Sequence, residues 1–471
     1  MLASAVSAVV LAFFGYFILT PSDTNKPRVR TATARPNIVF IMTDDMPKRL
    51  WRTMPTLRSQ VGAEGVRFTN AYVTQSLCCP SRATVLTGKY PHDHGITGNR
   101  APNGGEAEFR STGQDRDTIA TRMHAAGYRT ALIGKYLNGY TGEYVPPGWS
   151  YWYAESGENG VNDNGRVASD FSGSFQVTIA NKAKTFLDGA TDQAEDPPFM
   201  LFYWTTQPHL AAKAPQGYRN LFRDARLPRP PSFNEADVSD KPAYIKNLPS
   251  LTQDRIDRLE ANHKIQRRSL AHVDDVLKDM LGLLEDRGEL ANTYIVFATD
   301  NGVHMGEHRY VIPRGSKSTP YEEAASTPLM IRGPGVPHGG VRTGLVANND
   351  FASTFADWAN VSQPEGVDGR SITPLLSAAP PPAWRTALLN ESQFVKPEGS
   401  AFPNYEALFA ADGNRYVEYA TQEKELYDLE TDPYELTNSY DPNTMPAGLP
   451  SRLQALRSCA ADACRAAEGG P

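Results

Sequence analysis

The sequence predicts an α/β protein, with a large domain built on a mostly parallel sheet and a small α+β domain after it. Short apolar runs that are typical of buried strands alternate with amphipathic helical segments, which is the pattern of a mostly parallel sheet. A proline-rich segment at residues 378–382 marks a boundary, and the strand-like pieces after it are shorter. We therefore expect a large domain over residues 36–382 and a C-terminal subdomain over residues 383–471.

Each expected element rests on its own pattern. The strands of the large domain are the apolar runs at residues 37–42, 129–133, 199–204 and 294–298. A helix over residues 117–126 ends at Gly127. The apolar positions from Leu270 to Leu284 fall on one face of a second helix, which ends near Gly288. In the C-terminal subdomain we expect strands at residues 405–409 and 415–419.

The N-terminal segment is apolar. Residues 2–20 carry no charge, and a polar, basic-leaning stretch follows them. This run is long for a signal-peptide core and almost long enough to span a bilayer. We expect residues 1–35 to be a signal peptide or membrane anchor with a linker, and a buried core helix is the alternative. Export places the rest of the chain outside the cytoplasm.

The composition excludes several classes of protein. The chain has 471 residues, of which 40% are hydrophobic and 21% charged, so it is not a disordered tail protein. With 47 basic and 53 acidic residues the formal net charge is −6. This charge offers no general field for nucleic acid or an anionic membrane surface, so we expect no nucleic-acid partner. Any anionic substrate needs cations placed locally.

Four cysteines fall into two pairs. Cys459 and Cys464 are spaced so that a turn can close between them, and an exported chain permits the disulfide. A zinc site is the weaker interpretation, because no quartet of cysteine and histidine has the spacing of zinc ligands. The adjacent Cys78 and Cys79 are not expected to bond to each other and need a different explanation.

Chemically active residues follow the expected strands. Because ligands bind at the carboxyl ends of the strands in open α/β sheets, these positions are candidates for a site. Carboxylate and amide oxygens suit Ca²⁺ or Mg²⁺ and suit zinc poorly. A single Asp-Asp pair after a strand is more often a turn, but the arrangement recurs here. The residues are Asp44, Asp45, Lys135, His209, Asp300 and Asn301.

The segment from Cys78 to Lys89 reads as the start of a helix. Pro80 suits a first-turn position, so Cys78 is expected just before a helix N-terminus, where free amides favour an anion. Arg82 adds a positive charge one turn in. Two other interpretations stay open here: Cys78 is a small buried residue, or it is a thiolate nucleophile that needs a histidine base.

The same segment resembles the type I sulfatases. The family's C-x-P-S-R followed by x-x-x-L-T-G reads here as Cys78, Pro80, Ser81, Arg82, Leu86, Thr87 and Gly88. Residues 37–45, 300–302, 332–336 and 425–435 also resemble family stretches. Residues 134–154 are similar to the N-acetylglucosamine-6-sulfatase and heparan-6-O-endosulfatase branch. The resemblance implies an alkaline-phosphatase-like α/β/α sandwich with an antiparallel sheet in the C-terminal subdomain.

The resemblance also implies a mechanism. A formylglycine-generating enzyme would oxidise Cys78 to Cα-formylglycine, whose hydrate is the nucleophile. One hydroxyl attacks sulfur and expels the alcohol, and loss of the second hydroxyl's proton then releases sulfate by elimination. The implied cation is Ca²⁺, with Mg²⁺ as the alternative, and Arg82 would orient the diol. The implied metal ligands are Asp44, Asp45, Cys78, Asp300 and Asn301.

Lys135, His209 and Lys317 match the family's sulfate-binding positions. They would clamp the ester oxygens, and His209 or Lys317 would protonate the leaving alcohol. Taken alone, each of them reads as surface charge or as a core imidazole. Many arylsulfatases carry Lys-Trp-His after the second strand, but here the triplet is Lys-Tyr-Leu. We hypothesise that His304 or His92 replaces the missing histidine as the base.

Together these residues predict a sulfatase that acts on a sulfated carbohydrate or a small sulfate ester. Because no basic insert like that of the endosulfatases is present, we favour a small or terminal substrate. The aromatic run at residues 149–153 either stacks on sugars or, more often for such runs, belongs to the core. The alternatives are a phosphonate monoester or phosphodiester hydrolase on the same scaffold, and an unmodified binder of sulfated glycans.

Overall fold

The computed structural model describes residues 35–157, 160–168, 174–191, 197–311, 316–393 and 402–470. The apolar run at residues 2–20, for which we expect a signal peptide or anchor, lies outside these ranges. None of the helices in the described part of the chain combines the length and the apolar character that crossing a bilayer requires.

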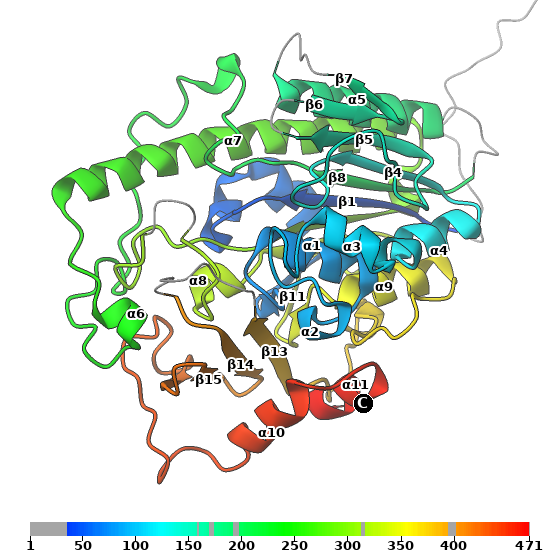
Figure 1. Cartoon of the computed structure of the whole chain (residues 1–471). Helices are drawn as coiled ribbons and strands as arrows, with labels where there is room; N and C mark the ends of the chain where they lie inside the picture. The colour runs from blue at the N-terminus through cyan, green and yellow to red at the C-terminus, as the bar shows by residue number, and fades with distance from the viewer. Residues whose placement is uncertain are drawn as a thin grey trace, which may run out of the picture.

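A ten-stranded sheet forms the centre of the molecule (Figure 1). In spatial order its strands are β11 (Gly340–Arg342), β2 (Val66–Phe68), β10 (Leu329–Arg332), β9 (Thr293–Thr299), β1 (Asn37–Thr43), β8 (Phe199–Trp204), β4 (Arg129–Gly134), β5 (Tyr151–Ser156), β6 (Gly160–Asp163) and β7 (Arg166–Ala168). The central strands β9, β1, β8, β4 and β5 run parallel, while β10, β6 and β7 pair antiparallel with their neighbours. The predicted mostly parallel sheet is confirmed, and the four predicted strands are β1, β4, β8 and β9.

Helices cover both faces of this sheet, so the molecule is an α/β/α sandwich (Figure 1). On one face lie α1 (Cys78–Thr87), α3 (Glu106–Ser111), α4 (Ile119–Ala125) and α9 (Asp350–Ala359). On the other lie α5 (Phe175–Ala190) and α7 (Gln253–Asp286). Successive residues of β1 point to opposite faces, so Phe40 packs with the first set and Ile41 with the second. Both cores therefore hold β1 rigidly, and its carboxyl end is fixed in place.

The long helix α7 begins earlier than its apolar pattern indicates. The sequence shows a continuous apolar face only from Leu270, whereas the helix starts at Gln253 and is capped by Thr252, whose hydroxyl accepts from the Arg255 backbone N–H at 3.4 Å. The first half of α7 extends past the edge of the sheet in Figure 1. This half of the helix buries less surface against the sheet. It therefore needs fewer apolar residues, and its helical pattern of apolar positions is weak.

A second, four-stranded antiparallel sheet packs beside the first. Its strands are β13 (Ala387–Ser392), β14 (Tyr405–Ala410), β15 (Asn414–Tyr419) and β16 (Lys424–Asp428), with α10 (Leu449–Leu456) and α11 (Asp462–Glu468) against it. The predicted disulfide between Cys459 and Cys464 is confirmed. The side chain of Asn390 donates to the Val73 carbonyl at 2.7 Å, which ties this sheet to the segment between β3 (Ala71–Tyr72) and α1. The boundary that we place at residue 382 stays a prediction.

Short elements complete the chain. The two-residue strands β3 (Ala71–Tyr72) and β12 (Val346–Ala347) pair with each other near the second sheet. The remaining α-helices of the described residues are α2 (Pro91–His94), α6 (Ala243–Lys246) and α8 (Glu322–Ala325), and one of several short 3-10 helices, η1 (Lys48–Thr53), follows β1.

The contact of His92 with the second sheet gives a pH-dependent stability. Its Nδ1 lies 2.8 Å from Glu391, and its Nε2 lies 2.9 Å from the Cys459 carbonyl oxygen. Burial lowers the pKa of His92, but Glu391 and the carbonyl outweigh burial and raise it to about 9. Stabilisation by the charged imidazole is therefore complete below its unfolded pKa, near 6.5, and is lost as the pH rises through 9.

We expect His92→Gln to lower the free energy of unfolding by about 1–3 kcal/mol at pH 6, with a smaller loss above pH 9. Urea unfolding of both proteins at each pH measures this difference. His338→Gln is the matched control, because His338 is paired with Glu64 but is 74% exposed. An equal loss at both pH values would show that the charge on His92 contributes nothing.

Candidate active site

Four neighbouring parallel strands end at the same edge of the large sheet. Thr43 at the end of β1 pairs with Thr299 at the end of β9, and the Asp300 backbone N–H donates to the Thr43 carbonyl at 3.0 Å. The segments after these strands are therefore held against each other, as the sequence predicts. They carry Asp44 and Asp45 after β1, Asp300 and Asn301 after β9, Lys135 after β4, and His209 after β8.

Three aspartates and a cysteine form the centre of the site. One ligand atom from each of Asp44, Asp45, Cys78 and Asp300 lies within 4.8 Å of the others. All four side chains are buried, and Asp45 is the most exposed at 6%. Carboxylates gathered out of water repel one another, so the site needs compensating cations.

Arg82 and Lys135 supply two of these cations. The Arg82 guanidinium lies 2.8 Å from the Asp300 carboxylate and 3.4 Å from that of Asp44. The Lys135 Nζ lies 2.5 Å from Asp44. Burial raises the pKa of Asp44, but Lys135 and Arg82 more than offset this and hold the pKa well below its ordinary value. Asp44 is therefore ionised throughout the physiological range.

Cys78 is the first residue of α1, rather than the residue before it. Its Sγ lies 2.9 Å from Lys317 Nζ, 3.7 Å from an Asp44 oxygen and 3.9 Å from an Asp45 oxygen. Burial raises the pKa of the Cys78 thiol to about 12, although Lys135 and Lys317 lower it. The unmodified thiol is therefore protonated at neutral pH, which argues against a plain thiolate nucleophile.

The donor set fits a hard divalent cation. Asn301 donates through Nδ2 to Asp45 at 2.7 Å, which fixes the orientation of its amide. Its Oδ1 is buried and has no hydrogen-bond partner among the described residues. A buried carbonyl oxygen without a donor beside three carboxylates matches the oxygen ligands that Ca²⁺ or Mg²⁺ prefers. The cysteine is the only sulfur in the group, so the set does not resemble a zinc site.

The predicted sulfate-binding side chains surround this centre. Lys317 is buried and its ammonium contacts the Asp45 carboxylate. His209 is 43% exposed, with its Nε2 at 3.6 Å from the other Asp45 oxygen. Lys135 and Lys317 are thus not solvated surface charges, and His209 is not a core imidazole. Together they present three nitrogen donors around Cys78 and Asp45.

The two histidines proposed as the base make their side-chain hydrogen bonds to residues outside the acidic cluster. His304 is buried, and its Nε2 contacts the Thr319 hydroxyl at 2.7 Å. Burial lowers the pKa of His304 to about 4, so its imidazole is neutral. None of its described contacts reaches the centre, and its role as the base stays a prediction. Both ring nitrogens of His92 are engaged, with Glu391 and with the Cys459 carbonyl oxygen, and the role of His92 as the base also stays a prediction.

Two side chains that support the site were not predicted from the sequence. The Ser81 hydroxyl donates to the Asp300 carbonyl at 2.5 Å, and the Asn348 amide donates to that hydroxyl at 2.9 Å. Asn348 thereby holds α1 against the end of β9. No local pattern predicts this, because Asn348 and Ser81 are 267 positions apart in the chain.

The aromatic run at residues 149–153 belongs to the core. Trp152 is fully buried, and its indole N–H donates to the Tyr140 hydroxyl at 2.9 Å. Tyr153 is also buried, on the opposite face of β5. Of the two interpretations of this run, the core one is confirmed.

Known proteins that are similar to this chain identify the family in which this site occurs. The Sulfatase family matches residues 36–361, and the family described as N-sulphoglucosamine sulphohydrolase, C-terminal, matches residues 306–458. The N-acetylglucosamine-6-sulfatase of Homo sapiens is 31% identical over 487 residues, covering 93% of this chain and 87% of that protein.

A further sequence relative and a solved structure point to the same family. The extracellular sulfatase SULF-1 homolog of Drosophila melanogaster is 34% identical over 370 residues, covering 75% of this chain and 32% of that protein. BT4656, solved in complex with its substrate D-glucosamine-2-N,6-O-disulfate, superposes with a TM-score of 0.75 at 25% identity. This superposition covers 92% of this chain and 98% of that one.

Proposed function

This chain belongs to the sulfatase family and is a sulfuric ester hydrolase, and from that premise we propose that it removes the 6-O-sulfate of a glucosamine unit. One observation carries the proposal: Cys78 opens α1 in contact with two of three buried carboxylates and with Lys317. The human relative named for N-acetylglucosamine-6-sulfate and the 6-O-sulfated substrate of BT4656 support this choice of sugar.

Sulfatases generally use a metal ion and a formylglycine. In our proposal a formylglycine-generating enzyme converts Cys78 during maturation, and the hydrated aldehyde is the nucleophile. Ca²⁺, with Mg²⁺ as the alternative, is held by the oxygens of Asp44, Asp45, Asp300 and Asn301. When bound, such a cation stabilises an ionised hydroxyl and polarises a sulfate oxygen.

The side chains of the chain itself then orient and neutralise the ester. Lys135 and Lys317 hold sulfate oxygens and stabilise the charge that develops on them in the transition state. Arg82, fixed by Asp300, keeps a positive charge behind the nucleophile. His209 lies at the solvent side of the site, where the leaving alcohol emerges, and donates its proton. Lys317 is the alternative donor.

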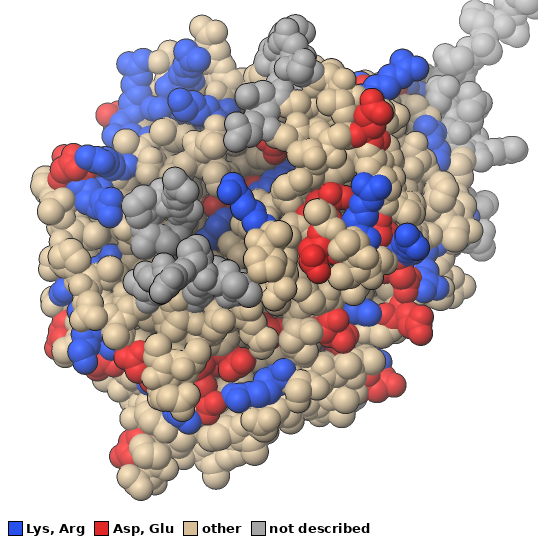
Figure 2. Space-filling view, viewed as in Figure 1, with Lys and Arg blue, Asp and Glu red and all other residues tan. Residues whose placement is uncertain are grey.

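The surface beside His209 supports an anionic saccharide as substrate. Residues 210–229, which follow His209, carry five basic side chains against the single acid Asp224. Figure 2 shows Lys and Arg atoms gathered at the upper left of the molecule, where Figure 1 places the segment between β8 and α7. A chain of net charge −6 thus presents local positive charge next to its candidate active site.

The mass of the tryptic peptide Phe68–Arg82 tests the proposed nucleophile. Protein from a host that has the maturing oxidase should yield this peptide with the Cys78 sulfur replaced by an aldehyde oxygen or its hydrate. An unmodified peptide from active protein would overturn the formylglycine. An unmodified peptide from inactive protein that still binds sulfated glycans would favour a binding protein.

Rates on matched esters test the reaction class. Aryl sulfate, phosphate and phosphonate esters with the same leaving group differ mainly in the charge and geometry at the reacting centre. We expect the sulfate ester to be the best substrate. A higher kcat/KM for the phosphonate would make the chain a phosphonate monoester hydrolase on this scaffold.

His209→Ala is expected to affect poor leaving groups selectively. A sugar alcohol needs a proton to leave, whereas nitrophenolate leaves as a stable anion. We expect kcat/KM to fall by about 10²–10⁴-fold on N-acetylglucosamine 6-sulfate and by less than about 10-fold on nitrophenyl sulfate. His124→Ala, on the distant helix α4, is the control and should change neither. Equal losses on both substrates would assign His209 to binding only.

We also propose that the protein acts outside the cytoplasm. The apolar N-terminal run and the Cys459–Cys464 disulfide support this, as does the extracellular sulfatase among the relatives. The disulfide joins residues five positions apart and is a feature of chains that fold in oxidising compartments.

A further inference from the structure

A cavity of about 420 Å³ lies next to the site but is not lined by any of its charged residues. Its walls come from η1, β2, α8 and residues 303–307. Pro47 and Val303 line it, and they follow Asp45 and Asn301 by two positions each. The cavity therefore lies behind the two segments that carry the candidate metal ligands. Its volume falls in the range of pockets that bind small molecules.

Three arginines that line this cavity have no carboxylate partner among the described residues: Arg49, Arg52 and Arg67. The guanidinium carbons of Arg52 and Arg67 lie 4.8 and 5.4 Å from the same ring, that of Trp51. Arg49 lies 5.6 Å from the ring of Tyr434. These aromatic contacts hold the guanidinium groups in place but leave their N–H donors free for an anion.

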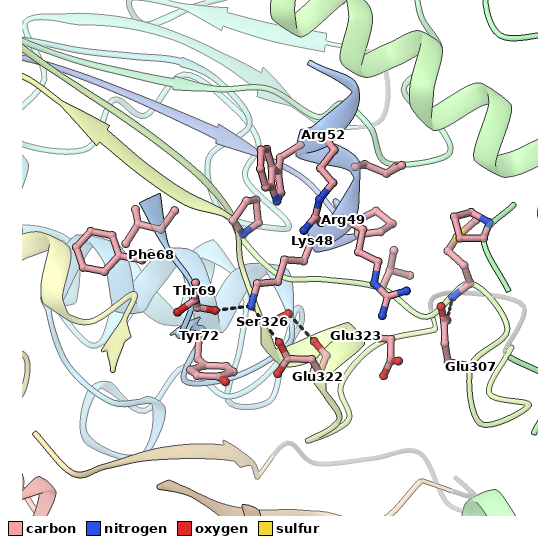
Figure 3. A pocket seen from close by; sticks show the side chains of 18 of the residues that line it. Lys48, Arg49, Arg52, Phe68, Thr69, Tyr72, Glu307, Glu322, Glu323 and Ser326 are labelled. Atoms are coloured by element: carbon pink, nitrogen blue, oxygen red, sulfur yellow. Dashed lines mark hydrogen bonds and ion pairs between the residues drawn. The ribbon is translucent and has the colours of Figure 1, made fainter. Parts of the chain in front are cut away.

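The acidic groups of the cavity are already compensated. Figure 3 shows Arg49 and Arg52 projecting from η1, with Glu322 and Glu323 on the opposite wall. Glu322 is paired with Lys48 at 3.0 Å and with Arg415 at 2.9 Å. The uncompensated charge on these two walls is therefore that of the arginines.

Two further acidic residues of this region, Glu323 and Glu307, add little uncompensated negative charge to the cavity. Glu323 lies 3.7 Å from His308, whose pKa rises to about 10 because the hydrogen bonds to Glu235 and Glu323 outweigh its burial. Burial raises the pKa of Glu307 to about 7, and its carboxylate accepts from the Met305 backbone N–H at 2.5 Å. Glu323 is thus paired with a cation, and Glu307 is only partly ionised at neutral pH.

Much of the remaining lining is apolar and fits a ring. Phe68, Leu227, Met305 and Leu429 contribute apolar surface, and Thr69 and Ser326 are polar groups beside it. A ligand that satisfies both halves carries an anionic group for the arginines and a compact ring for the apolar wall. Free inorganic sulfate or phosphate would leave the apolar half without a contact.

We propose that this cavity is an accessory binding site for a sulfated monosaccharide unit, with the sulfate held by Arg49, Arg52 and Arg67. The sugar is chosen on the basis of the proposed function, whereas the anion and the ring follow from the cavity itself. Guanidinium groups bind sulfate oxygens through paired N–H donors, and this geometry gives the site its preference for an anion.

The test is a calorimetric titration of N-acetylglucosamine 6-sulfate into the full-length Cys78→Ala protein, which cannot turn the sugar over. We expect two binding sites per chain. The added triple substitution Arg49→Ala, Arg52→Ala and Arg67→Ala should leave one. The matched control removes three exposed arginines elsewhere, Arg58, Arg116 and Arg166, and should keep both. Sulfate-free N-acetylglucosamine should bind the accessory site at least about tenfold more weakly.

Each outcome tests the accessory site by the stoichiometry of binding, without a measurement of catalysis. If the sugar did not bind the active site, the parent would show one site that the triple substitution removes, and the accessory site would stand while the proposed function failed. Unchanged stoichiometry in a folded triple variant would overturn the accessory site. If the triple variant does not fold, Arg67→Lys should weaken one site at least about threefold, and no change would overturn the proposal.

Discussion

Cys78→Ser is expected to abolish sulfate ester hydrolysis, with a loss in kcat/KM of at least about 10⁴-fold. The serine hydroxyl can contact the same two carboxylates, Asp44 and Asp45, and Lys317, but it lacks the second hydroxyl of a hydrated aldehyde. Without that hydroxyl the sulfate cannot be released by elimination. The measurement uses N-acetylglucosamine 6-sulfate and nitrophenyl sulfate, with protein from a host that contains the formylglycine-generating enzyme.

Cys79→Ser is the matched control for this substitution. Cys79 is adjacent and equally buried, but it is not part of the acidic cluster, and its backbone N–H is held by Asn99 at 2.9 Å. We expect this variant to retain activity within a few-fold, and both variants to keep the thermal midpoint within a few degrees. Comparable activity of the Cys78→Ser and wild-type proteins would refute the aldehyde nucleophile.

The convergence of the strand ends was predictable because it follows from local pattern. Parallel strands place their carboxyl ends at one edge, so Asp44 and Asp300 had to lie close together once their strands were assigned. Lys317 was different. It follows no strand, and only the resemblance to sulfatases assigned it to the site, yet it contacts Cys78 directly.

Contacts between distant parts of the chain were not predictable. Asn348 supports Ser81 across 267 positions, and His92 joins Glu391 across 299. The start of α7 was also missed, since its first half lies beyond the sheet and carries few apolar positions. Spacing and periodicity report on a residue's own element, whereas these contacts depend on how elements pack.

Removing the divalent cation is the second change with a large expected effect. In the proposed function, three buried carboxylates and the unpartnered Asn301 oxygen are the ligands of the cation, and they come together only in the folded chain. Folding should therefore be stabilised by Ca²⁺, by about 2.7 kcal/mol at a free concentration 100 times the Kd. Dialysis against a chelator should lower both the thermal midpoint and activity, and added Ca²⁺ should restore them. Parallel additions of Mg²⁺ identify the preferred ion.

Asp45→Asn separates this cation effect from a general loss of structure. The amide keeps the shape of the carboxylate and one oxygen acceptor, but it removes one negative charge from the donor set and from the partner of Lys317. We expect kcat/KM to fall by about 10³-fold and the rise in thermal midpoint with Ca²⁺ to disappear. Asp224→Asn, at an exposed position, should behave like the wild type. If Asp45→Asn retained the full Ca²⁺-dependent stabilisation, the cation would be bound elsewhere, and the arrangement of Asp44, Asp45 and Asp300 would be only an ion-pair network with Arg82, Lys135 and Lys317.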